Sequence, residues 1–150
     1  MIRRGITGLS SFRSLEPIEK VNFKDFKTAV YFVAQSHNLR VENIEQPNVT
    51  PNFYKVLLLG QNIRIWALCN TTFPIVAFTN SLENWFQEGF LDLPEIGASF
   101  ATLGYQVATA EYLEHSLQQK DLITLNDAEI KAIQYWRPET VGRVIFNWFD

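Results

Sequence analysis

Few side chains in this sequence could perform covalent or acid–base chemistry: the 150 residues include one cysteine and two histidines. A nucleophile needs a base beside it, and the histidine bases available to Cys69 are His37 and His115. His37 with Cys69 is therefore one candidate catalytic pair. His115 with Glu111 is the other, because residues four apart are neighbours on a helix and could share a proton or a metal ion.

Each of these residues also has a structural interpretation, which we favour. Cys69 ends an apolar segment, where a cysteine behaves as a small buried hydrophobic residue. His37 extends the apolar stripe of a predicted helix and is expected at its C-terminal end. Glu111 and His115 are expected to form an exposed helical pair. A small enzyme with an inconspicuous His/Glu or His/Cys site remains the alternative hypothesis.

Metal and cofactor sites find little support in the sequence. One cysteine and two histidines cannot complete a structural zinc site of the usual Cys/His kind. The segment 53–79, which we expect to form the core of a sheet, contains no Asp, Glu or His for two-metal catalysis. Neither G-x-G-x-x-G nor G-x-x-x-x-G-K-[ST] occurs. We therefore predict no cofactor and assign no catalytic or metal-ligating residue.

The charged residues are distributed unevenly along the chain. Residues 1–40 contain seven basic and three acidic side chains, whereas residues 41–150 contain six basic and thirteen acidic ones, and the net charge is −3. No Lys or Arg lies between Arg64 and Lys120. A field of one sign attracts partners of the opposite sign and repels nucleic acid, so we predict no nucleic-acid binding.

The acidic segment between Arg64 and Lys120 also contains aromatic residues, and this combination predicts a protein-binding surface. Acidic groups steer a basic partner, and exposed aromatic groups supply the binding energy. The candidate partner-binding residues are Glu83, Trp85, Glu88, Asp92, Glu95, Glu111, Tyr112 and Glu114. The chain is thus predicted to be a non-enzymatic protein-binding module. The most specific version of this hypothesis is an immunity-type or inhibitor protein that blocks a basic partner such as a toxin.

Two other interpretations of the same acidic residues stay open. They could form a solvated negative surface that maintains solubility, or the chain could be a structural subunit of an assembly. A single cysteine excludes an internal disulfide, and the first residues lack the run of about 7–15 apolar residues of a secretory signal. We expect a cytoplasmic protein without a membrane segment; the oligomeric state is left open.

The predicted fold is α+β, in one domain that spans residues 1–150. A helix is expected over 22–37, followed by a three-strand meander with a turn at residues 60–62; its strands are Phe53–Leu59, Ile63–Cys69 and Phe73–Thr79. Further helices are predicted from capping residues and apolar spacing over 80–89, 92–103, 109–119 and 126–136. A short strand over 105–108 and an apolar C-terminal strand, Val141–Phe149, complete a mixed, mostly antiparallel sheet with helices packed on it.

Overall fold

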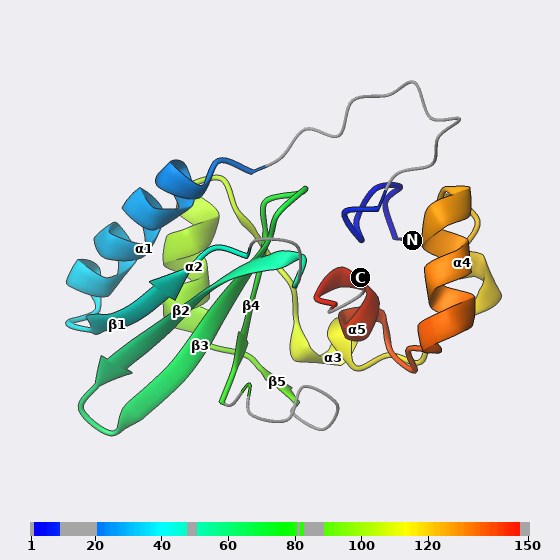
Figure 1. Ribbon diagram of the computed structural model, residues 1–150. Coiled ribbons are helices and arrows are strands. Elements are labelled where there is room, and N and C mark those ends of the chain that lie inside the picture. Colours follow the sequence, from blue (N-terminus) through cyan, green and yellow to red (C-terminus); the bar gives the residue numbers. More distant parts are fainter. Residues whose placement is uncertain (1, 10–20, 48–50, 81, 83–88, 148–150) are drawn as a thin grey trace.

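The computed structural model describes residues 2–9, 21–47, 51–80, 82 and 89–147. In that part of the chain a six-stranded, mostly antiparallel sheet is covered by helices, which confirms the predicted α+β class (Figure 1). The elements are, in chain order, α1 (Phe23–Ser36), β1 (Arg40–Glu45), β2 (Phe53–Gly60), β3 (Ile63–Asn70), β4 (Ile75–Thr79), β5 (Phe90–Leu91), α2 (Pro94–Thr102), β6 (Gln106–Val107), α3 (Ala110–Leu113), the 3-10 turn η1 (Gln119–Asp121), α4 (Asp127–Trp136) and α5 (Val141–Ile145).

The sheet is an antiparallel meander with one parallel addition. Strands β1 to β5 are neighbours in chain order, and β6 pairs with β4 in parallel. The predicted turn at residues 60–62 joins β2 and β3, with Gly60 opposite Ile63 and Asn62 at a φ of 63°. Asparagine tolerates this left-handed conformation better than most residues, which favours a tight hairpin here.

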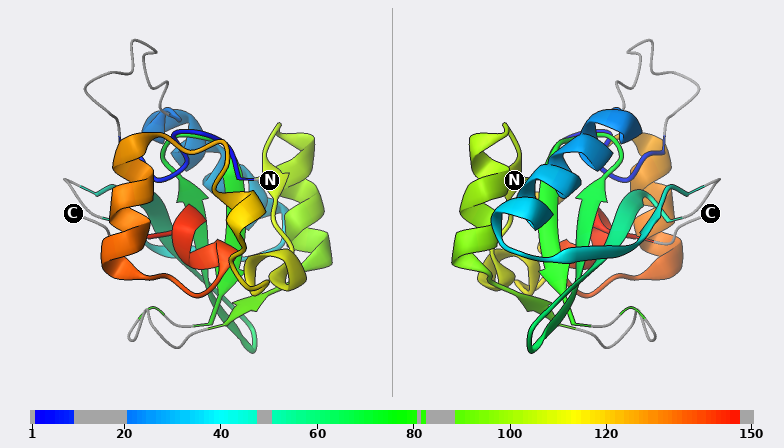
Figure 2. Two further views of the ribbon diagram at one scale, coloured as in Figure 1. Left: turned by 90° about the vertical axis from the view of Figure 1, so that its right-hand side faces the viewer. Right: turned by 90° about the vertical axis from the view of Figure 1, so that its left-hand side faces the viewer.

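Two hydrophobic clusters lie on opposite faces of the sheet. On one face α1 and α2 pack through Phe26, Val30 and Phe100 against alternate residues of β2, β3 and β4. On the other face, the N-terminal segment, α4 and α5 cover Phe53 and Leu68. Figure 2 shows α1 on one side of the sheet and α4 with α5 on the opposite side. Both faces of the sheet are therefore covered.

The two best-marked helices begin where their capping residues predict. The side chain of Asn22 accepts a hydrogen bond from the Asp25 nitrogen at 3.1 Å at the start of α1. The side chain of Asn126 likewise accepts from the Glu129 nitrogen at 2.9 Å, and the Glu129 carboxylate accepts from the Asn126 nitrogen at 3.2 Å. This reciprocal capping box satisfies two of the free N–H groups at the start of α4.

The predicted C-terminal strand, Val141–Phe149, is wrong. Residues Val141–Ile145 form the short helix α5, and residues 148–150 lie outside the described ranges. Val141, Val144 and Ile145 follow helical i, i+3, i+4 spacing and are all buried. Gly142 packs so closely that a Cβ atom there would lie 2.6 Å from Phe90 and 2.9 Å from the Leu113 carbonyl oxygen.

Other boundaries also differ from the prediction. The helix expected over 109–119 is only α3, Ala110–Leu113, after which Ser116 forms an isolated bridge with Thr140. The helix expected from residue 92 begins at Pro94, and most of the helix expected over 80–89 lies outside the described residues. Strand β1 was not predicted, because a bulge between Val41 and Asn43 breaks the alternation that marks a strand.

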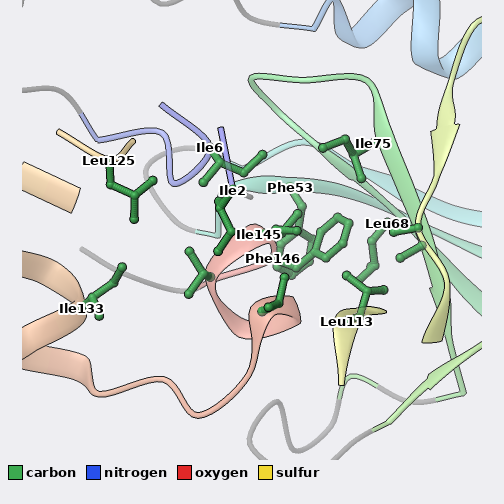
Figure 3. Packing of buried hydrophobic residues seen from close by; sticks show 14 residues of the cluster. Ile2, Ile6, Phe53, Leu68, Ile75, Leu113, Leu125, Ile133, Ile145 and Phe146 are labelled. Carbon is green, nitrogen blue, oxygen red and sulfur yellow. The ribbon is translucent and has the colours of Figure 1, made fainter. Parts of the chain in front are cut away.

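Buried polar groups fasten the N-terminal segment and α5 to the ends of β2 and β3. The side-chain amides of Asn52 and Asn70 each donate to the carbonyl oxygens of Ile6 and Ile145, at 2.7–3.0 Å. Figure 3 shows Ile6, Ile145 and their apolar neighbours gathered between the sheet and α5. Because buried amides without partners are costly, this network specifies where the two segments lie.

Candidate functional site

The structure describes five of the eight predicted partner-binding residues. Glu83, Trp85 and Glu88 lie outside the described ranges. Asp92 follows β5, Glu95 lies in the first turn of α2, and Glu111, Tyr112 and Glu114 lie on or directly after α3. The five residues divide between two neighbouring features, a surface on α3 and a hollow at the start of α2.

Four of these residues come together where β5 meets α3. The Asp92 carboxylate accepts a hydrogen bond from the Ala110 nitrogen at 2.9 Å, and the Glu114 carboxylate accepts one from the Phe90 nitrogen at 3.2 Å. We call Asp92, Glu111, Tyr112 and Glu114 the α3 surface. Asp92, directly after β5, thus binds the first residue of α3, and Glu114, directly after α3, binds the first residue of β5. The sequence did not indicate this structural role.

Glu111 and Tyr112 are the members of the α3 surface that are most available to a partner. Glu111 is exposed and Tyr112 is 39% exposed. Burial, with a smaller contribution from the negative charge of Asp121, raises the pKa of Tyr112, so its hydroxyl stays neutral at pH 7. Among the described residues, the ion pairs are Arg40–Glu42 and Lys55–Glu45, and neither neutralises the α3 surface.

Glu95 lies in a surface hollow of about 560 Å³ rather than on the α3 surface. Three segments line this hollow: residues 37–39 after α1, residues 60, 61 and 63 at the β2–β3 turn, and residues 93–96 at the start of α2. Its walls combine apolar side chains with the polar side chains of His37, Asn38, Gln61 and Glu95. Hollows of about 300–1,000 Å³ with this mixture are typical of ligand sites.

One member of the hollow, His37, makes a contact that the sequence did not predict. Its Nε2 atom lies 2.7 Å from the Ser99 hydroxyl of α2, and this hydrogen bond joins the end of α1 to α2. Residues 37 and 99 are far apart in the sequence, and neither lies in a motif that would have paired them. His37 does lie at the C-terminal end of a helix, as predicted.

The structure does not bring His37 and Cys69 together as a catalytic pair. His37 lines the hollow with Ile63, the first residue of β3, whereas Cys69 is six residues further along that strand, or roughly 20 Å. Cys69 is fully buried, as predicted, and burial raises the pKa of its thiol. A buried neutral thiol is a poor nucleophile.

The second pair, Glu111 and His115, does not share a helix. Because α3 ends at Leu113, His115 lies beyond the C-cap residue Glu114. Both side chains are exposed, and among the described contacts no hydrogen bond or ion pair joins them. The prediction that Glu111 and His115 are neighbours on one helix is therefore wrong.

The described residues contain neither a cluster of metal-ligating side chains nor a helix that could span a membrane. Within the described ranges, no three His, Cys, Asp or Glu side chains come together as a group that could hold a metal ion. No helix in the same part of the chain is both long and apolar enough to cross a membrane. In comparisons with known proteins, no family model, curated protein or solved structure matches this chain.

Proposed function

We propose that the protein is a non-enzymatic protein-binding module and that its α3 surface binds a basic partner protein. The observation that carries the proposal is the exposed carboxylate of Glu111, which has no ion-pair partner among the described residues and lies beside the partly exposed Tyr112. A negative group next to an amphipathic aromatic ring provides both attraction and contact area for a basic protein.

The hydrogen bonds at the edges of the α3 surface support this proposal. Helix α3 has only four residues and would not be stable by itself. Asp92 and Glu114 hold it against the β5 region through their bonds to the nitrogens of Ala110 and Phe90. A surface that is ordered before binding loses less conformational entropy when the partner arrives, which favours affinity.

The specific form of the proposal is an immunity-type or inhibitor protein that blocks a cationic toxin, such as a nuclease. A nuclease attracts its substrate through basic residues around its active site. A surface with fixed carboxylates presents the same sign of charge as the phosphates of that substrate and competes for the same residues. The absence of Lys and Arg from residues 65–119 favours this kind of recognition.

The test is capture of the partner from a lysate of the native host, with the wild-type chain and two variants as bait. Glu111→Lys reverses a charge on the α3 surface, and Asp127→Lys makes the same change in charge on α4. Both carboxylates are exposed and lie in the first turn of a helix, so the two variants lose the same favourable interaction with a helix N-terminus.

We expect the wild type and Asp127→Lys to retain a strongly basic protein that Glu111→Lys does not retain. The melting temperatures of the two variants should agree within a few degrees, which excludes misfolding as the cause. Retention of the same proteins by all three baits would contradict the proposal, and so would loss of the partner from both variants.

A second candidate function, a subunit of a larger assembly, is favoured by exposed aromatic side chains. Tyr31 and Phe32 on α1 are 50% and 54% exposed, and Tyr135 on α4 is 78% exposed. Groups of exposed apolar side chains often mark interfaces. A mass measurement in solution decides between the candidates: a monomer over the micromolar range removes self-assembly, and a single defined oligomer supports it.

A further inference from the structure

The hollow at the start of α2 is formed by three segments: two turns and the first residues of the helix itself. Asn38, with a φ of 56°, turns the chain from α1 into β1, and the β2–β3 turn brings Gln61 to the same place. Helix α2 begins at Pro94 and supplies the third wall. The hydrogen bond between His37 and Ser99 fixes the end of α1 against α2, so two of the three walls are held together.

The side chains that line the hollow suit an amphipathic group, with an apolar part and a polar end. Apolar surface comes from the side chains of Leu39, Ile63, Leu93, Pro94 and Ile96. The polar part consists of the exposed carboxylate of Glu95 and the side chains of His37, Asn38 and Gln61. Apart from His37, Glu95 is the one ionisable side chain among the described residues that line the hollow, and its negative charge favours a cation.

A guanidinium group on an aliphatic chain matches these walls. The three methylene groups of an arginine side chain cover apolar surface while the charged end reaches polar groups. The planar end offers five N–H donors, and acceptors are available on the Glu95 carboxylate and on the amide oxygens of Asn38 and Gln61. A hollow of about 560 Å³ also has room for part of the backbone that carries the side chain.

The hollow begins one residue after Asp92 of the α3 surface. Asp92, which accepts from the Ala110 nitrogen, directly precedes Leu93 of the hollow, and Glu95 lies three residues further on. Three residues of chain span at most roughly 10 Å. A partner surface of standard size, about 800 Å² on each side, is wider than this separation.

We propose that the hollow receives an arginine side chain of the basic partner, with the guanidinium group against Glu95 and the aliphatic part on Ile63, Leu93 and Pro94. The proposal rests on the function proposed above and names the side chain that the partner uses. Arginine is enriched among the residues that contribute most to protein–protein binding, and those residues tend to occupy pockets on the opposite surface.

The hollow is tested first with a small probe, N-acetyl-arginine amide, against the otherwise similar neutral citrulline compound. Amide chemical shifts of the full chain are followed by NMR during each titration. The arginine compound is expected to shift the signals of Asn38, Gln61 and Glu95 with a dissociation constant on the order of millimolar, as suits one side chain. The citrulline compound is expected to bind at least about tenfold more weakly.

Three variants test the assignment to the hollow. Glu95→Gln removes the charge with little change in shape, and Gln61→Lys adds a positive charge at an exposed turn residue. Both should weaken the arginine compound by about tenfold, while the control Asp127→Asn on α4 should leave its binding unchanged. Equal binding of the two compounds, no binding of either, or shifts confined to α3 would each overturn the proposal.

Binding of the captured partner to the variants shows whether this proposal alone is wrong or whether the proposed function is also wrong. If Glu95→Gln binds the partner as tightly as the wild type but Glu111→Lys does not bind it, the role of the hollow is overturned and the proposed function stands. If Glu111→Lys also binds like the wild type, the proposed function is overturned, even where the arginine compound occupies the hollow.

Discussion

The carboxylate of Asp92 accepts a hydrogen bond from the backbone nitrogen of Ala110, at 2.9 Å, and so fixes the start of α3 beside the end of β5. An N–H group in the first turn of a helix has no partner within the helix, so a carboxylate there satisfies a donor and interacts favourably with the helix dipole. The same residue precedes the hollow. Asp92 therefore connects the two features that we propose form one binding surface.

Replacement of Asp92 should loosen α3 without unfolding the protein. Asp92→Ala is expected to lower the free energy of unfolding by about 1 kcal/mol, because one charge-assisted hydrogen bond to a helix start is lost. Urea denaturation measures this change. Asp92→Asn keeps an acceptor oxygen and should recover part of the loss; an alanine variant as stable as the wild type would show that the bond to Ala110 contributes little.

The N-terminal segment should depend on the buried carboxylate of Glu129. This side chain is 0% exposed and accepts from the nitrogens of Gly5, Thr7 and Asn126 and from the Thr7 hydroxyl. Glu129→Ala leaves several buried donors without a partner, so we expect a loss of roughly 3 kcal/mol or more in the free energy of unfolding.

The matched comparison for Glu129 is Thr7→Val, which removes only the hydroxyl donor and keeps the shape of the side chain. It should cost about 1 kcal/mol. Hydrogen exchange gives a local measure, because the amides of Gly5 and Thr7 should lose protection in Glu129→Ala before the amides of β3 do. Unchanged exchange at these two amides would contradict the role assigned to Glu129.

Cys69 should be unreactive in the folded protein. It is fully buried among apolar residues, and burial raises the pKa of the thiol, so almost no thiolate forms at pH 8. A thiol reagent such as DTNB is expected to react only as fast as the protein unfolds, and at full rate in concentrated denaturant. Rapid reaction under native conditions would show that the β3 region opens locally.

Stability should fall at alkaline pH through Tyr105. Burial, with smaller contributions from the charges of Cys69 and Asp25, raises the pKa of Tyr105 from 10.0 to about 12. The unfolded chain therefore releases the phenolic proton at a lower pH than the folded chain does. The contribution of the neutral Tyr105 phenol to the free energy of unfolding is fully present below pH 10. This contribution is lost as pH rises towards 12.

The variant Tyr105→Phe tests this linkage. Between pH 9 and pH 11 its melting temperature should fall less than that of the wild type, because it has no phenol to ionise. The ring contacts with Phe26 and Phe100 can persist in the variant. Parallel decreases in the two proteins would assign the alkaline loss of stability to other groups, among them Tyr54, whose pKa is also raised.

Local signals in the sequence predicted part of the fold. Asn22 and Asn126 marked the starts of α1 and α4 because capping uses groups within one turn of the helix. The prediction of a C-terminal strand was wrong because the composition of the segment and its spacing indicate different structures. The segment has the β-branched composition of a strand, whereas Val141, Val144 and Ile145 satisfy helical spacing. Long-range packing of Gly142 against Leu113 favours the helix, and a single sequence does not show that contact.

The candidate site was predictable only where it is local in the sequence. The lack of Lys and Arg around Asp92, Glu111 and Tyr112 is visible directly, and the structure places these residues close together. The hollow was missed because it depends on three distant segments, each with ordinary residues. Glu95 was selected for its charge, but its apolar surroundings appear only when the β2–β3 turn and the end of α1 are brought beside α2.

The most direct test of the proposed binding surface is the affinity of the captured partner, once purified, for the wild type, Glu111→Gln, Glu95→Gln and the control Asp127→Asn at two ionic strengths. Each of the first two variants is predicted to bind at least about fivefold more weakly at low salt, with a smaller difference at high salt, while the control binds like the wild type. Equal affinities for all four proteins at both ionic strengths would contradict the account.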